Sequence, residues 1–290
     1  MRNIRTDLAF EAVVAGARSS DVAKRTEKLM GYEVTTLTIG EEAAHDLGKP
    51  AGMYISADFG RLWNADRSET EKAAGMICSL IERIAPEGDG CVLAVGLGND
   101  RVTPDSVGPK AMKKIVVTRH IKKLDPELYA RLSFGECAAV ITGVLGETGV
   151  ESADILKGVA ERVKPRCIIA IDALSARSMD RLATTVQITA AGIAPGSGVN
   201  NRRSEISAKT MGFPVISLGF PTVVDAATLT LDMLEESGVG GEALAAAEHK
   251  LCGGKNSLFV SPKDCDIITD SLAELASSAV NLFVHGVTSV

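Results

Sequence analysis

The stretch Cys167-Ile168-Ile169-Ala170-Ile171-Asp172 decides the fold class. Its five apolar residues stand between Lys164-Pro165-Arg166 and a carboxylate, a pattern typical of a strand that is buried on both faces of a sheet. Similar short apolar runs occupy Tyr32 to Ile39, Cys91 to Val95, Ala138 to Val144 and Pro214 to Leu218. Apolar residues at i, i+3, i+4 spacing predict helices over Glu69 to Ile84, Ser152 to Val163 and Pro221 to Ser237. This β-α-β alternation predicts an α/β fold with a mainly parallel sheet.

The rest of the chain adds shorter elements to this pattern. TTVQIT, at residues 184–189, is predicted as a further strand, and Pro262 to His285 is predicted to close the chain with a helix. Between them, GIAPGSGVNNRRS forms a polar, Gly-rich loop, and a long loop in a compact domain is often functional. Because no internal repeat or linker divides the sequence, we expect a single domain over residues 1–290.

Composition excludes several classes of protein. With 31 Lys+Arg against 37 Asp+Glu, the net charge is −6, so direct nucleic-acid binding is not expected. The chain is 46% hydrophobic and 23% charged, which excludes general disorder. No run approaches the 18 apolar residues of a membrane span, and no signal-peptide core is visible, so we expect a cytoplasmic protein without a membrane partner. The six cysteines form no C-x-x-C pair and are predicted to be buried free thiols.

Ligands of parallel α/β sheets bind where strands end and lead into the next connection. The segment Gly96 to Pro109, GLGNDRVTPDSVGP, follows one predicted strand and offers oxygen atoms from Asn99, Thr103 and Asp105. It lacks both G-x-G-x-x-G and G-K-[ST], so nucleotide binding is disfavoured. Asp172 and Asp225 follow two other predicted strands. Asp172 could instead be the N-cap of a following helix, and Asp225 could instead lie in the first turns of a helix, where a negative charge is favoured.

Asp105 and Asp172 are predicted to project from adjacent strand ends into one crevice. Two carboxylates a few ångströms apart share one proton, so the pair can be a base toward water and an acid toward a leaving amine. They could also hold a metal, but a hydrolytic zinc site usually includes histidine, and none of the four histidines follows a predicted core strand. No G-x-S-x-G motif indicates a serine nucleophile. We expect Asn99 and Thr103 to orient the reacting groups, and the basic pair Arg202 and Arg203 to contact substrate or another subunit.

Seven ordered motifs resemble the germination proteases of spore-forming bacteria. They are RTDLA (Arg5 to Ala9), GLGNDRVTPDSVGP (Gly96 to Pro109), VTRH (Val117 to His120), GETGVESADILKGV (Gly146 to Val159), KPRCIIAIDALSARS (Lys164 to Ser178), GIAPGSGVNNRRSEIS (Gly192 to Ser207) and PTVVDA (Pro221 to Ala226). The resemblance implies a three-layer α/β/α fold similar to that of hydrogenase-maturation proteases and nucleoside phosphorylases. It implies an atypical aspartic endopeptidase, without a cofactor, whose two catalytic aspartates fall on Asp105 and Asp172.

The implied substrates are the small acid-soluble proteins that coat spore DNA, cleaved in the spore core during germination. The resemblance also implies that the enzyme is a homotetramer and that it is made as an inactive precursor. The alternative on the same fold is a metal-dependent peptidase or maturation protease, although no histidine here matches the metal-binding one of the hydrogenase-processing relatives. Only Met1 to Ile4 precede Arg5, and the segment Glu236 to Ser257 is shorter than in relatives, so we expect differences in propeptide and insert.

Overall fold

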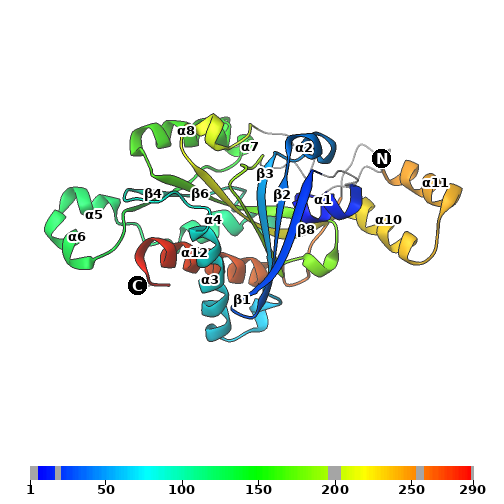
Figure 1. Cartoon of the computed structure of the whole chain (residues 1–290), viewed down its shortest axis with the longest axis horizontal. Coiled ribbons are helices and arrows are strands. Elements are labelled where there is room, and N and C mark those ends of the chain that lie inside the picture. Colours follow the sequence, from blue (N-terminus) through cyan, green and yellow to red (C-terminus); the bar gives the residue numbers. More distant parts are fainter. Residues whose placement is uncertain (1–5, 17–20, 195–203, 253–257, 289–290) are drawn as a thin grey trace.

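The computed structural model describes residues 6–16, 21–194, 204–252 and 258–288. Within them, one nine-stranded sheet runs through the molecule in the order β1-β2-β3-β7-β8-β6-β4-β5, with β9 paired to β8 (Figure 1). The strands are β1 (Val22–Leu29), β2 (Tyr32–Ile39), β3 (Gly52–Asp58), β4 (Val92–Gly96), β5 (Cys137–Ile141), β6 (Cys167–Ala176), β7 (Thr185–Thr189), β8 (Val215–Asp225) and β9 (Phe259–Val260).

The sheet is mixed, so the prediction of a mainly parallel sheet is wrong. Strands β8, β6, β4 and β5 are parallel, whereas β1, β2, β3 and β7 pair antiparallel up to β8. Strand β1 is polar and mostly exposed, which an antiparallel strand tolerates because one of its faces can meet water. A two-residue turn, Met30-Gly31, joins it to β2 with positive φ at both residues, as tight hairpins require. A polar, exposed strand of this kind is not visible as an apolar run.

Helices cover both faces of the sheet (Figure 1). They are α1 (Ala9–Gly16), α2 (Glu41–Leu47), α3 (Arg67–Glu82), α4 (Val107–Met112), α5 (Arg119–Leu124), α6 (Pro126–Leu132), α7 (Leu145–Thr148), α8 (Ser152–Val163), α9 (Ala208–Met211), α10 (Ala226–Glu236), α11 (Gly241–Cys252) and α12 (Cys265–His285), with 3-10 turns η1 (Leu62–Asn64), η2 (Thr103–Asp105) and η3 (Met179–Arg181).

Strand β4 shows how the layers form. Its Val92 and Ala94 pack into the core beneath the sheet with α3, α4 and α12, whereas Leu93 and Val95 pack above it with α8. Every residue of β4 is therefore buried, as the apolar run predicts. Helix α12 is long and apolar enough to cross a bilayer, but it is a core helix here, since more than half of it is buried.

Strands β6 and β8 run further than the apolar runs predict. β6 continues through Asp172 to Ala176, and β8 continues through Pro221 to Asp225. The helix expected from Pro221 therefore begins only at Ala226. Pro221 lacks the amide hydrogen that a strand residue donates to its neighbour. It is tolerated in β8 because the pairing with β6 shifts register directly after Leu174, the residue opposite Pro221.

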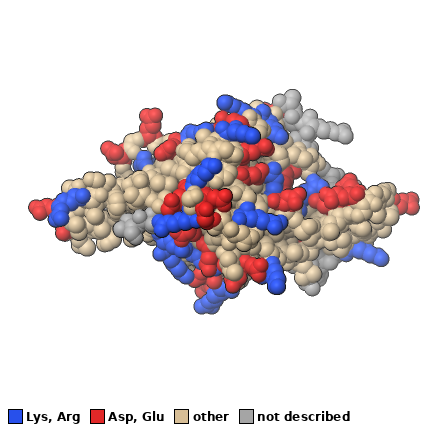
Figure 2. Space-filling model, turned by 90° about the horizontal axis from the view of Figure 1, so that it is seen from below, with Lys and Arg blue, Asp and Glu red and all other residues tan. Residues whose placement is uncertain are grey.

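Acidic and basic side chains are interspersed over the face that α3 and α12 cover. Figure 2 shows this face, with no continuous basic stripe across it. Ion pairs join the two signs there, for example Lys110 with Asp270 at 2.9 Å and Lys113 with Asp100 at 2.7 Å. The face offers no extended positive surface of the kind that tracks a nucleic-acid backbone.

Candidate active site

The connection from β4 to α4 holds Asp105 in a closed loop. Gly98 turns the backbone with φ +102°, and the Asn99 amide then donates to the Asp105 carbonyl at 3.0 Å. The Asp105 amide donates in turn to the Val102 carbonyl at 2.8 Å. A Cβ on Gly98 would lie 2.2 Å from the Asp105 carbonyl oxygen and 2.9 Å from its Oδ1. The Asp105 carboxylate therefore packs against a position where only glycine fits.

Asp172 lies inside strand β6, one residue beyond Ile171, the last residue of β6 that pairs with β4. It is 4% exposed and stands opposite Gly219 of β8. Its Oδ1 accepts the Ala173 amide at 3.0 Å. Because β6 continues as a strand to Ala176, the N-cap interpretation of Asp172 is excluded. A buried carboxylate within a strand needs a reason other than capping.

The structure brings Asp105 and Asp172 to the same edge of the sheet. Ile171, the residue before Asp172, pairs with Gly96 of β4, and the Leu97 amide donates to its carbonyl at 2.9 Å. Leu97 precedes Gly98, against which Asp105 packs, and η2 itself lies against β6 and β8. Asp172 is thus buried within β6, and Asp105 is half-buried on the connection that follows the neighbouring strand β4. Two carboxyl groups so placed are suited to general acid–base chemistry.

The supporting residues fall in different places. The Asn99 Oδ1 accepts the Arg101 amide at 2.8 Å and so shapes the loop that carries Asp105. Thr103 is exposed, and its carbonyl accepts the Ser106 hydroxyl at 2.7 Å. Asp225 caps α10 by accepting the Thr228 amide at 2.9 Å, six residues along β8 from Gly219, a span of about 20 Å. Arg202 and Arg203 lie outside the described residues.

Sequence reasoning missed the segment that braces β6 just beyond Asp172. The amide of Asp7 donates to the Ser175 carbonyl at 2.8 Å, and the Ser175 amide donates back to the Asp7 carboxylate at 2.9 Å. Glu11, which is buried, accepts the Arg177 amide at 2.6 Å and the Ser178 amide at 3.0 Å. The RTDLA motif contains part of this segment, but no local pattern indicates that its partner lies more than 160 residues away.

Other chemistries find less support in the described part of the chain. Within residues 6–16, 21–194, 204–252 and 258–288, no group of three His, Cys, Asp or Glu side chains is placed to hold a metal. His120 is exposed on α5. The described cysteines are free thiols, and burial raises the pKa of Cys137 to about 12 and that of Cys167 to about 11. A thiol that stays protonated at neutral pH is a poor nucleophile.

Comparison with known proteins gives the family. A family model described as germination protease matches residues 11–236, which include both aspartates and the strands that carry them. The chain is 39% identical to the germination protease of Caldanaerobacter subterraneus subsp. tengcongensis, over 96% of this chain and 93% of the relative. It is 35% identical to that of Clostridium acetobutylicum, over 97% and 95% of the two chains. The match to the protein from Bacillus mycoides is 39% identical over 80% of this chain and 66% of the relative. The chain belongs to the germination protease family and is a peptidase.

Proposed function

We propose that this chain is an endopeptidase that cleaves small acid-soluble spore proteins during germination, with Asp105 and Asp172 activating the attacking water. The observation that carries the proposal is the placement of a buried and a half-buried carboxylate at one edge of the parallel strands. Family membership supports peptide-bond hydrolysis, and both the loop that holds Asp105 and the strand that holds Asp172 lie within the matched region.

The mechanism follows from the repulsion between two like charges. Carboxylates that lie close together do not both ionise readily, so one keeps its proton at neutral pH. The ionised partner takes a proton from water, which attacks the scissile carbonyl. The protonated partner then donates its proton to the leaving amine. Asn99 keeps the Asp105 loop in shape, and Thr103 stands exposed on the same turn, where a substrate can reach it.

The wider assignments are part of the same proposal. The continuous sheet supports one domain over residues 1–290. The resemblance supports a homotetramer of the spore core that is made as a precursor, acts without a cofactor and binds its protein substrates directly, away from membranes. Arg202 and Arg203 are proposed to contact the substrate.

Asp105→Asn and Asp172→Asn test the mechanism. Each should lower kcat by about 100-fold or more, because one carboxyl of the acid–base pair is lost. The control is Asp66→Asn at the exposed N-cap of α3, where Asp66 accepts the Glu69 amide at 3.0 Å, because asparagine caps almost as well. Cleavage of a small acid-soluble spore protein, with circular dichroism on each variant, is the measurement. Full turnover by either folded active-site variant would remove that residue from the mechanism, and loss of activity with a chelator would favour the metal-dependent alternative.

A further inference from the structure

The outer edge of β5 is open to another strand. β5 is the last strand of the sheet and pairs only with β4 in the described part of the chain. The Val92 amide of β4 donates to the Glu136 carbonyl at 2.9 Å. Because every second residue of a strand directs its backbone groups to the same side, the backbone groups of Ala139 and Ile141 point away from β4. Cys137, which also faces outward, already bonds Thr118, through contacts of 3.0 and 2.9 Å. Among the residues that the structure describes, the backbone groups of Ala139 and Ile141 thus have no partner on their outer side, which makes this edge a template for strand addition.

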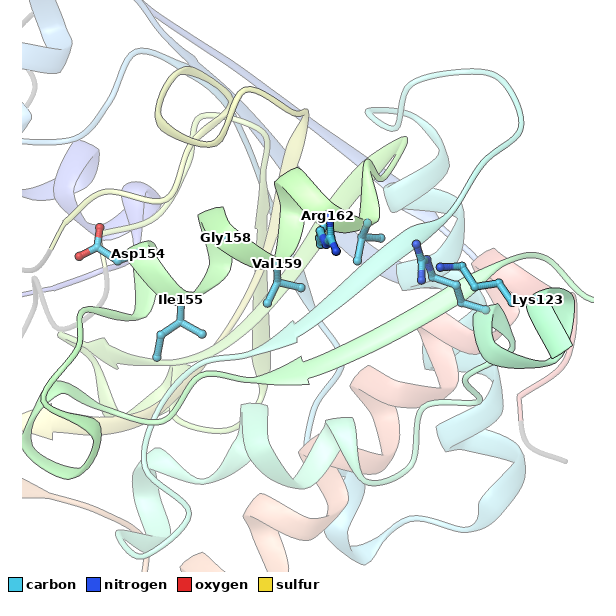
Figure 3. A pocket seen from close by; sticks show the side chains of 8 residues that line it. Lys123, Asp154, Ile155, Gly158, Val159 and Arg162 are labelled. Atoms are coloured by element: carbon cyan, nitrogen blue, oxygen red, sulfur yellow. The ribbon is translucent and has the colours of Figure 1, made fainter.

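A groove runs beside this edge. It has a volume of about 760 Å³ and is lined by one flank of α8, including Ile155 and Val159, and by Arg119 and Lys123 of α5 (Figure 3). Val159 packs against the same core cluster as Ala138 and Val140 of β5, so the groove follows the strand. A chain added to β5 would have its side chains on one face covered by Ile155 and Val159.

Charge is unequal along the groove. Lys123 and Arg162 lie toward one end and Asp154 toward the other (Figure 3). Arg119 is paired with Glu136 at 3.5 Å, whereas Lys123 and Arg162 have no ion-pair partner among the described residues. A peptide with two acidic side chains complements both.

We propose that β5 and this groove bind an extended, acidic segment of the protein substrate by strand addition. The proposal rests on the peptidase function proposed above. The Ser152 hydroxyl donates to the Gly143 carbonyl at 2.9 Å, which places the Asp154 end of α8 at the end of β5. There Ile141 pairs with Gly96, two residues before Gly98 and the Asp105 loop. The groove therefore leads from its basic end toward the two aspartates.

The length of α8 sets the spacing of the recognition. Asp154 and Arg162 are eight residues apart on α8, about 12 Å, which is the length of about four extended residues. An acidic pair held by Lys123 and Arg162 is thus at least about four residues from the scissile bond. Acidic residues nearer the bond do not reach these cations.

The test measures binding apart from turnover. Fluorescence anisotropy of a labelled ten-residue peptide, Val/Thr-rich with two glutamates at one end, would be followed on the Asp172→Asn protein. Lys123→Glu and Arg162→Glu, added singly, should each weaken binding about fivefold and reduce its salt dependence, as loss of an exposed ion pair predicts. The matched control is Lys157→Glu, the same charge reversal on the exposed face of α8 outside the groove. Equal effects at positions 157 and 162 would overturn the proposal.

Two further arms separate the alternatives. Two peptides would be N-methylated, one at its odd-numbered and one at its even-numbered residues. Only one of them should lose binding, because only every second amide of an added strand faces β5. Equal loss of binding by both peptides would contradict strand addition. On otherwise wild-type enzyme, Arg162→Glu should raise KM for the acidic substrate more than KM for a short neutral peptide. Failure of the aspartate mechanism would give a different result, because the Asp105→Asn enzyme would then still cleave both the acidic substrate and the neutral peptide. A shift in oligomer size by light scattering, with peptide binding unchanged, would assign the edge to a second copy instead.

Discussion

Gly98 is the residue on which the position of Asp105 most depends. Its φ of +102° disfavours any side chain, and a Cβ would also meet the Asp105 carbonyl at 2.2 Å. Gly98→Ala should therefore lower kcat at least tenfold, because the new methyl group displaces the Asp105 carboxylate. It should also lower the free energy of unfolding by roughly 1–2 kcal/mol, the cost of a left-handed conformation for an L-residue. Gly60→Ala is the matched control, because Gly60 has φ +76° and nothing within 4 Å of its Cβ. Equal kcat values for the two variants, measured beside urea unfolding, would show that the loop adapts without consequence for Asp105.

His285 makes the stability of the fold depend on pH. Burial lowers the pKa of its imidazole below the usual range, against the opposing effect of a hydrogen bond with the Val116 carbonyl at 2.9 Å. A hydrogen bond with the Gly135 backbone also favours the charged form, but burial outweighs both hydrogen bonds, so protonation costs the folded state free energy. The folded state thus binds fewer protons than the unfolded state below about pH 6.5, and stability falls as pH drops from there through the folded pKa. The melting temperature of the wild type should decrease over this range more than that of His285→Gln; parallel curves would show that another group is responsible.

At the scale of elements, agreement between sequence and structure depends on whether the signal is local. Helix α8 matches its predicted bounds, because its amphipathic repeat ends where Lys164 adopts a left-handed conformation. Strand β1 is not predicted, because its polar pattern becomes a strand only through pairing with β2. Strands β6 and β8 are predicted too short, because their second halves are held by each other, by β9 and by the N-terminal segment.

In the candidate site too, features with a local sequence signal are predicted and those that depend on distant contacts are not. Asp105 and Asp172 are predicted together because parallel strands deliver their carboxyl ends to one edge, and the pairing of Gly96 with Ile171 places both there. The capping alternative for Asp172 depends on a helix that the long β6 replaces. The helix expected to contain Asp225 begins one residue after it, so Asp225 is its N-cap. The bracing of β6 by Asp7 and Glu11 depends on contacts across the whole chain, which no local pattern encodes.

At the scale of the whole molecule, the N-terminal segment ties the two halves of the sheet together. Asp7 and Glu11 bind the end of β6, while the Ala9 amide donates to the Gln187 side chain of β7 at 2.7 Å. Lys49, beyond β2, donates to the Thr6 carbonyl at 2.8 Å, and burial lowers the pKa of its ammonium group. The antiparallel half and the parallel half therefore meet at this segment, three residues along β6 from Asp172.

Glu11→Ala tests whether this junction supports the site. Removing the carboxylate leaves the part-buried amides of Arg177 and Ser178 without their acceptor, which should lower the free energy of unfolding by about 1–2 kcal/mol. Because β6 is held there beyond Asp172, kcat should fall as well, whereas Glu11→Gln, which keeps one acceptor, should lose less of both. The control is Glu42→Ala on the exposed first turn of α2. Urea unfolding and peptide cleavage measured on all three variants decide the matter: a destabilised Glu11→Ala protein with unchanged kcat would mean that the segment stabilises the sheet without holding Asp172 in place.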